Sequence, residues 1–221
     1  MRCFTAAMIA AACSGVVACG GYKDSGTTPS AGPRFFVTSS TSTTGNLGGL
    51  AGADARCQSL AAGVGLGGKT WRAYLSAERD TSGARVDARS RIGQGPWTNV
   101  NGVTVANNLN ELHSRRGDAA AFIDERGQRI NGQWTGSPGP NQHDILTGSN
   151  ADGTVMVGFT CADWTSDSAS LAAQVGHSDG FGGNQDTSGT LTSWNSAHAN
   201  QNCSNTAPRG GAGKIYCFAT N

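Results

Sequence analysis

The chain has 221 residues, the length of one large domain or two small ones. Only 14% of the residues are charged, about half of the roughly 25% that is usual in globular proteins, and the formal net charge is +1. This balance argues against a polybasic nucleic-acid-binding protein, and no apolar run reaches the ~18 residues that a membrane-spanning helix needs. The 33 glycines, together with many Ser, Thr and Asn, favour turns and irregular loops over long helices.

Residues 1–18 have the pattern of an export signal. Arg2 supplies a positive charge, residues 4–12 are apolar or small throughout, and residues 16–18 (Val-Val-Ala) precede Cys19. The pattern resembles the bacterial lipoprotein signal, in which the cysteine is lipidated and becomes the new N-terminus; an ordinary cleaved secretory peptide is the alternative. We expect an exported lipoprotein that is held in a bacterial membrane through Cys19, at the outer membrane or the cell surface.

A polar, glycine-rich segment separates this signal from the rest of the chain. Residues 19–33 are too polar to pack and predict a flexible tether, whereas residues 34–221 have the composition of a folded domain. The domain is expected to begin with a strand over residues 34–38. Apolar residues then recur at helical spacing over residues 50–64, which predicts an amphipathic helix with Cys57 on its buried face.

The remaining predicted elements are strands and turns. A strand is expected over residues 70–75, and the Asn-Gly pair at 101–102, between two β-rich stretches, predicts a hairpin. A second hairpin is expected around residues 125–127. After about residue 131 the pattern favours loops, until a last strand over residues 214–220.

The cysteine count predicts two disulfides. Of seven cysteines, two leave with the signal and Cys19 is assigned to the lipid, so four remain in the domain. An even number in an exported chain favours disulfide pairing, and the residues alone allow three connectivities. No two of the four have the C-x-x-C spacing of zinc ribbons or thioredoxin-like sites. The four are Cys57, Cys161, Cys203 and Cys217.

Several stretches of residues 34–221 together resemble a known family. GLAGADARCQSLAAGVGLGGKTWRAYLSA (49–77) is similar to the first helix and following strand of the endostatin domain, the C-terminal module of collagens XV and XVIII. HDILTGSNADGT (143–154), TCADWTS (160–166), CSN and KIYCFAT are similar to the second half of that domain. The four-cysteine framework, with Trp164 three residues after the second cysteine, adds to the resemblance, which bacterial endostatin-like surface lipoproteins share.

This resemblance implies an α+β fold of the C-type-lectin-like kind: a twisted mixed sheet, one or two helices, a long irregular loop region and two disulfides. It further implies the pairs Cys57–Cys217 and Cys161–Cys203. The implied function is non-catalytic binding or adhesion to extracellular protein or matrix ligands. The histidine-rich zinc site and the basic heparin-binding surface of mammalian endostatin have no counterpart in this sequence, so neither zinc nor heparin is carried over as a ligand.

A bound metal ion is a separate hypothesis that the residues themselves raise. Three of the four histidines and two aspartates lie in the loop-rich half of the domain, and a zinc or calcium ion would need their nitrogen and oxygen atoms to converge. Separations along the chain do not determine whether they do. The alternative interpretation is that each side chain hydrogen-bonds to loop backbone. The five candidates are His143, Asp144, His177, Asp179 and His198.

The alternative function is a carbohydrate-binding lectin, with calcium as a candidate cofactor. Residues 150–153 and 194–196 are similar to fragments of the calcium sites of C-type lectins, although the full set of oxygen ligands is missing. The two arginines among the ligand-binding candidates adjoin a turn and are expected to be exposed, whereas Trp71 and Trp164 are expected to be buried. The ligand-binding candidates are Arg115, Arg116, Trp194 and Asn195.

One motif matches an enzyme signature only in its letters. Residues 176–180 match G-x-S-x-G, but that nucleophile motif needs a helix after the serine, and the glycine-rich residues that follow cannot form one. A polar turn is the simpler interpretation, and we expect no enzymatic activity.

Overall fold

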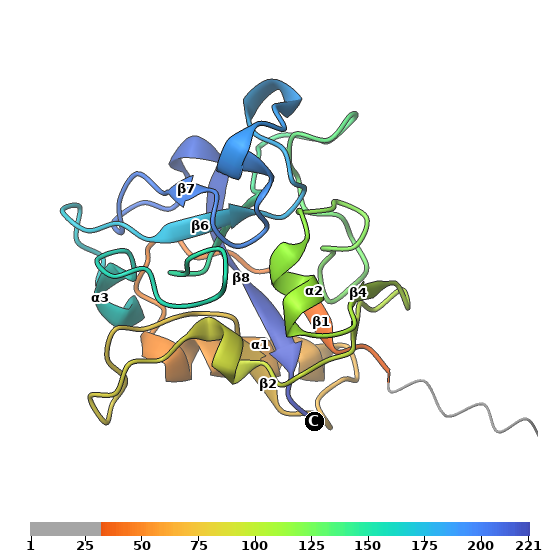
Figure 1. Ribbon diagram of the computed structural model, residues 1–221, viewed down its shortest axis with the longest axis horizontal. Coiled ribbons are helices and arrows are strands. Elements are labelled where there is room, and N and C mark those ends of the chain that lie inside the picture. The colour runs from red at the N-terminus through yellow and green to blue at the C-terminus, as the bar shows by residue number, and fades with distance from the viewer. Residues whose placement is uncertain (1–31) are drawn as a thin grey trace, which may run out of the picture. The chain divides into compact units, whose positions relative to one another are not determined.

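The computed structural model describes residues 32–221 (Figure 1). The predicted signal peptide, Cys19 and the predicted tether up to residue 31 lie outside the described residues. No helix among residues 32–221 has the length and apolar character needed to cross a bilayer. The described residues form an α+β fold with few helices, two sheets and two disulfides, as predicted at this coarse level.

The larger sheet is built around the longest strand, β8 (Gly211–Ala219). Figure 1 shows β8 running through the middle of the domain, with β6 and β7 near its start and α1 beneath its end. β8 pairs antiparallel with β1 and β2 and parallel with β5, and the sheet continues antiparallel through β6 to β7. These strands are β1 (Phe35–Val37), β2 (Trp71–Ala73), β5 (Asp144–Leu146), β6 (Gln174–His177) and β7 (His198–Ala199).

The second sheet is the predicted hairpin. β3 (Trp97–Thr98) and β4 (Thr104–Ala106) pair antiparallel on either side of Asn101-Gly102, and Gly102 has a φ of 78°. Such a left-handed conformation favours glycine, which explains why this residue type stands in the turn. The hairpin expected around residues 125–127 is also confirmed, as a bridge between Ile123 and Arg129.

The predicted first helix is confirmed as α1 (Gly49–Gly63). Its buried side chains, Ala53, Cys57 and Ala61, recur every four residues and form one face. The sequence did not predict α2 (Leu109–Ser114), which starts where the Asn108 side chain accepts a hydrogen bond from the backbone of Glu111. The remaining helical segments are α3 (Cys161–Trp164) and the short 3₁₀ turns Ala88–Arg91, Gly183–Gln185, Gly189–Thr192 and Pro208–Gly210.

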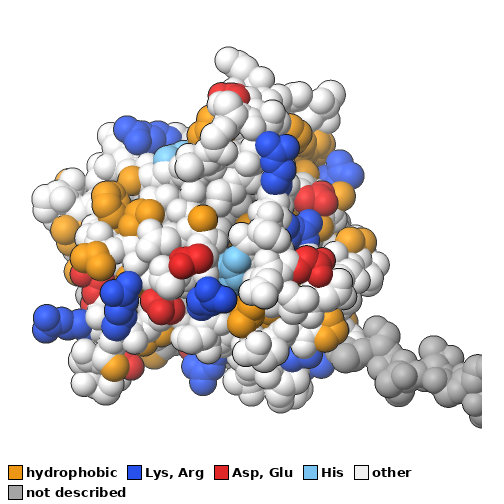
Figure 2. Space-filling model, in the orientation of Figure 1, with side chains coloured by type: hydrophobic (Ala, Val, Ile, Leu, Met, Phe, Trp, Pro, Cys, Tyr) orange, Lys and Arg blue, Asp and Glu red, His pale blue; other side chains and the backbone are white. Residues whose placement is uncertain are grey.

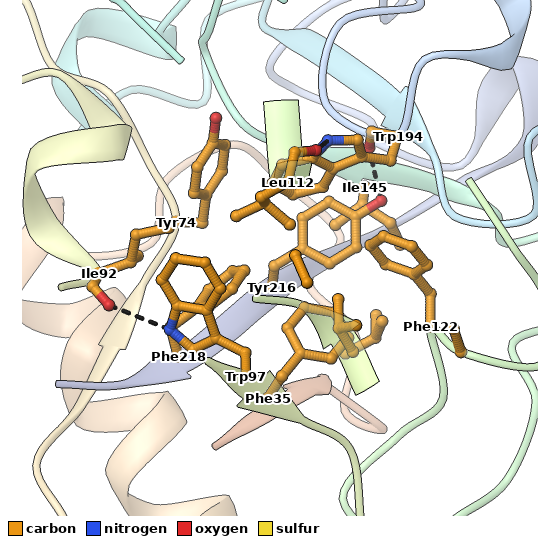
Figure 3. Packing of buried hydrophobic residues seen from close by; sticks show 14 of the residues in the cluster. Phe35, Tyr74, Ile92, Trp97, Leu112, Phe122, Ile145, Trp194, Tyr216 and Phe218 are labelled. Atoms are coloured by element: carbon orange, nitrogen blue, oxygen red, sulfur yellow. Dashed lines mark hydrogen bonds between the residues drawn. The ribbon is translucent and has the colours of Figure 1, made fainter. Parts of the chain in front are cut away.

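Both faces of β8 are buried because its side chains alternate between two hydrophobic clusters. Tyr216 and Phe218 point into one cluster, and Ile215, Cys217 and Ala219 point into the other. Figure 3 shows the first cluster, in which aromatic rings from distant parts of the chain surround Tyr216. The Tyr216 hydroxyl donates to the Trp194 carbonyl oxygen at 2.6 Å, so its polar end is satisfied inside the core.

The two disulfides have the pairing that the resemblance implies. Cys57–Cys217 ties α1 to β8, with 5.5 Å between the Cα atoms. Cys161–Cys203 closes the irregular segment between these two cysteines, with 5.7 Å between the Cα atoms. Both distances are ordinary for a bridge.

The inner disulfide begins at a strained turn. All four residues of α3 have positive φ values, between 49° and 66°, and each such non-glycine residue costs roughly 1–2 kcal/mol. The turn persists because neighbours fix both of its ends: Cys161 is bridged, and the buried Trp164 indole donates to the Ser76 carbonyl oxygen at 2.8 Å. Trp71 and Trp164 are both buried, as predicted.

The prediction that residues after 131 are mostly loop is wrong in one respect. This region supplies β5, β6 and β7, which form one end of the larger sheet. These strands have only two to four residues and no alternation of apolar and polar side chains, because β5 and β6 are buried throughout. The period-2 signal that identifies a half-buried strand is therefore missing.

We predict different consequences for loss of the two disulfides. The double variant C57A/C217A should lower the free energy of unfolding of the whole domain by up to about 5 kcal/mol, since this bridge closes the longer loop. The double variant C161A/C203A should instead raise amide hydrogen exchange first in residues 162–202. Hydrogen exchange followed by mass spectrometry measures both. Equal exchange throughout the domain in the two variants would contradict this division.

A second prediction concerns Gly176 in β6. A Cβ atom there would lie 1.9 Å from the Trp194 carbonyl oxygen, whereas one on Gly183 would meet no atom within 4 Å. Gly176→Ala should therefore cost about 2–3 kcal/mol or more in urea unfolding. The matched change Gly183→Ala should stay within about 0.5 kcal/mol of wild type. Similar unfolding midpoints for the two variants would refute the close approach of β6 to residue 194.

Candidate metal centre

The end of the larger sheet brings the five predicted metal-site residues together. Asp144 and His177 are directly paired across β5 and β6, so their side chains leave the same face. His198 begins β7 and pairs with Val175, two residues before His177, which places it diagonally on that face. His143 precedes β5, and Asp179 follows β6 by two residues.

The Asp144 carboxylate lies at the centre of this group. Its Oδ1 atom is 3.2 Å from His143 Nε2 and 3.3 Å from His177 Nε2, and its Oδ2 atom is 3.6 Å from His198 Nε2. The side chains of Asp144, His143 and His177 are at most 3% exposed, and that of His198 is 27% exposed. Neither carboxylate oxygen accepts a hydrogen bond from any other group of residues 32–221, and only a protonated His143 ring can donate to Oδ1. A buried charge without a partner is costly, so this group calls for a cation.

The outer nitrogen of each imidazole ring is fixed by an acceptor. In all three rings the Nδ1 atom lies 2.8 Å from an oxygen that can only accept a hydrogen bond. Two of these oxygens are backbone carbonyls, and the third belongs to an ionised carboxylate. Each Nδ1 therefore carries a proton, which it donates outward. The acceptors are Asp179 Oδ1 for His143, the Leu191 carbonyl oxygen for His177 and the Ala199 carbonyl oxygen for His198.

The consequence is that three nitrogen lone pairs point inward in the neutral rings. The Nε2 atoms of His177 and His198 are only 2.9 Å apart, and both lie beside the Asp144 carboxylate. Lone pairs and a negative charge at such distances repel one another unless a cation lies between them. A metal ion meets this requirement, and backbone acceptors behind ligating histidines are the usual arrangement at metal sites.

The distances fit a small divalent ion bound by nitrogen and oxygen. With metal–ligand bonds of 2.0–2.2 Å, two ligands of a tetrahedral zinc ion lie about 3.3–3.6 Å apart. The possible ligand atoms of His143, Asp144 and His177 all lie within 4.8 Å of one another, and His198 Nε2 lies 2.9 Å from His177 Nε2 and 3.6 Å from Asp144 Oδ2. Calcium fits poorly, since it takes 6–8 oxygen ligands and the group offers one carboxylate.

Protons are the other source of positive charge in this centre. Burial would lower the pKa of His143, but hydrogen bonds to Asp144 and Asp179 and their charges outweigh it and raise the pKa to about 9. Burial, followed by the charge of His143, lowers the pKa of His177 to about 4. Burial would raise the pKa of Asp179, yet His143 and two backbone N–H groups hold it below its usual value. Without a metal, the proton therefore resides on His143.

The two arginines among the ligand-binding candidates differ in exposure. Arg116 is exposed, as predicted, whereas the expectation that Arg115 is exposed is wrong. The Arg115 guanidinium lies 4.9 Å from the centroid of the Phe122 ring and 3.6 Å from Asp118, which is the acidic partner that a half-buried arginine needs. On the face that Figure 2 shows, basic and acidic side chains lie interspersed among polar and apolar ones.

Trp194 and Asn195 are corrected as ligand-binding candidates, because both are buried. Trp194 is part of the aromatic cluster and donates to the Leu112 carbonyl oxygen at 2.8 Å (Figure 3). The amide of Asn195 donates to the Tyr74 hydroxyl at 3.0 Å. Asp152, in the other lectin-like fragment, accepts hydrogen bonds from Thr154. The 194–196 fragment is therefore buried, whereas in the 150–153 fragment Asp152 is exposed and its Oδ1 atom is used by Thr154.

The G-x-S-x-G stretch is confirmed as a turn. Ser178 is buried, and its backbone N–H donates to the His143 carbonyl oxygen at 2.9 Å. Only the short 3₁₀ turns at Gly183–Gln185 and Gly189–Thr192, and no α-helix, follow it before β7, so the serine does not stand on the strand-to-helix turn of a nucleophile motif.

Sequence reasoning missed the Leu191 and Ala199 carbonyl oxygens, because any residue type supplies that group.

The sequence matches no protein-family model and no curated protein.

Proposed function

We propose that this protein is an exported, lipid-anchored, non-catalytic binding module that carries one zinc-type divalent ion. The ion is bound by Asp144 and by the Nε2 atoms of His143, His177 and His198. One observation carries the proposal: the buried Asp144 carboxylate faces the Nε2 atoms of three imidazole rings, and the Nδ1 atom of each ring lies beside an acceptor. The Nδ1 atom of each ring already has an acceptor, so the atoms that need a cation beside them are the Nε2 atoms and the carboxylate.

The ligand count favours a structural ion. Four protein atoms complete the tetrahedral shell of zinc, so no position is left for water or substrate. The ligands come from β5, β6, β7 and the residue before β5, which are short strands at one end of the sheet. An ion there would hold together strands that backbone hydrogen bonds alone hold weakly.

The binding function itself rests on the resemblance to the endostatin domain. The disulfide pairing and the α+β arrangement, with short strands around the long strand β8 and one long helix, support an endostatin-like, C-type-lectin-like fold. The ligands expected from that resemblance are extracellular proteins or matrix. A calcium-dependent lectin is less well supported, since Trp194 and Asn195 are buried and the exposed Asp152 is a single carboxylate, whereas calcium takes 6–8 oxygen ligands.

We predict that the purified protein contains about one zinc ion per chain and that zinc raises its unfolding temperature. A free ion concentration of about 1,000 times Kd adds about 4 kcal/mol to the free energy of unfolding. Asp144→Asn and His177→Gln should abolish this stabilisation. The matched changes Asp186→Asn and His113→Gln, at residues outside the centre, should retain it. Metal analysis and thermal unfolding with and without a chelator measure both effects.

The metal-free protein provides the control against a merely structural Asp144. Without zinc, Asp144→Asn removes the anionic partner of protonated His143, so it should lower the stability at neutral pH and have less effect as the pH rises through about 9. The readout for the metal is therefore the rise in unfolding temperature on adding zinc, and a wild type whose unfolding temperature zinc does not change would refute the metal centre.

The anchor gives a separate prediction. If Cys19 is lipidated, the native protein should partition into detergent, and Cys19→Ser should release it into the aqueous phase, because stable attachment needs more than one acyl chain. Phase partitioning followed by immunoblotting decides this. A Cys19→Ser protein that stays in the membrane fraction would show that the lipid is not the anchor.

A further inference from the structure

A shallow cavity of about 550 Å³, largely open to solvent, lies beside the candidate metal centre. Its walls are formed by residues 115–120, Arg129, Asp179 and Phe181. Asp179 is shared between the two sites, because the same carboxylate accepts the Nδ1 proton of His143. The volume lies within the range of pockets that hold a small molecule or one group of a larger ligand.

The two carboxylates of this cavity, those of Asp118 and Asp179, already have hydrogen-bond donors within the domain. Asp179 accepts from His143 Nδ1 and from the backbone N–H groups of Gln133 and Phe181, so three donors stabilise its charge. Asp118 accepts from the backbone of Ala120 and lies 3.6 Å from Arg115. The negative charges in the walls therefore have their partners within the domain.

Two arginines of the cavity have no carboxylate partner among the described residues. Neither Arg116 nor Arg129 has a carboxylate oxygen within 4.0 Å in the part of the chain that the structure describes. Arg116 donates one hydrogen bond, to the Thr187 carbonyl oxygen at 3.1 Å, and Arg129 lies 5.2 Å from the centroid of the Trp134 ring. Since a guanidinium has five N–H donors, most of their donors are free.

A backbone donor lies in the same wall. The N–H of Ala119 has no acceptor within residues 32–221, although its neighbours on both sides donate, to Ser178 and to Asp118 respectively. The cavity thus combines two unpaired positive charges with a free backbone N–H, and its acceptors are occupied.

From this combination we infer that the cavity binds an anionic group: a carboxylate, sulfate or phosphate of a small or extracellular ligand. Guanidinium groups bind such oxyanions through paired N–H donors, and a backbone N–H adds a third direction of binding. The inference rests on the proposed binding function, for which it names the chemistry of the ligand, and it does not require the metal ion.

The test is a titration of the purified protein with sodium sulfate, phosphate or acetate, each against sodium chloride at equal ionic strength. Nuclear magnetic resonance follows the Ala119 amide and the Nε–H groups of Arg116 and Arg129. We expect saturable shifts with at least one of the three oxyanions and none with chloride. The oxyanion that binds most tightly identifies the anionic group of the ligand.

Arg116→Gln and Arg129→Gln should each weaken this binding about tenfold or more. The matched change Arg126→Gln, at an exposed arginine 3.6 Å from Glu125, should leave it unchanged. Shifts that do not saturate, that chloride reproduces, or that Arg126→Gln reduces equally would mean an adventitious ion only and would overturn the inference. The zinc content of these variants should equal that of wild type, so a failure here is distinct from a failure of the metal centre.

Discussion

The arrangement at the end of the larger sheet depends on the charge of Asp144. Its carboxylate is buried and is surrounded by three imidazole rings whose Nδ1 protons point away from it. Such a group needs positive charge beside it, either the proton on His143 or a metal ion. The direction of each ring is set in turn by backbone and carboxylate acceptors, so the polypeptide around the site is organised to present lone pairs, not protons.

This constraint explains how a glycine-rich chain with very short strands can hold a defined sheet end. β5, β6 and β7 have two to four residues each, and long irregular segments join them. Two disulfides act at different places: Cys57–Cys217 joins the long helix to β8, and Cys161–Cys203 closes the irregular segment. The proposed metal ion would add a third cross-link, between the three short strands. Each cross-link replaces order that a larger set of backbone hydrogen bonds supplies in other sheets.

The sequence predicted best what depends on local patterns. The helix around Cys57, the Asn-Gly hairpin and the last strand all have periodicity or turn chemistry that can be read directly. β5 and β6 were missed because they are buried on both faces and so do not alternate. The residues of the candidate metal centre were chosen by residue type alone, and their convergence depends on strand register, which no spacing along the chain contains. Arg115 was misjudged because its cover, the Phe122 ring, comes from tertiary packing.

The protonation of the histidine rings tests the metal centre most directly. A long-range ¹H–¹⁵N correlation spectrum of the zinc-loaded protein distinguishes a ring nitrogen that carries a proton from one that binds a metal. The arrangement predicts that His143, His177 and His198 are all protonated on Nδ1 and that their Nε2 signals shift when zinc is added, while those of His113 do not. A proton on Nε2 of any of the three rings, or a spectrum that zinc leaves unchanged, would contradict it.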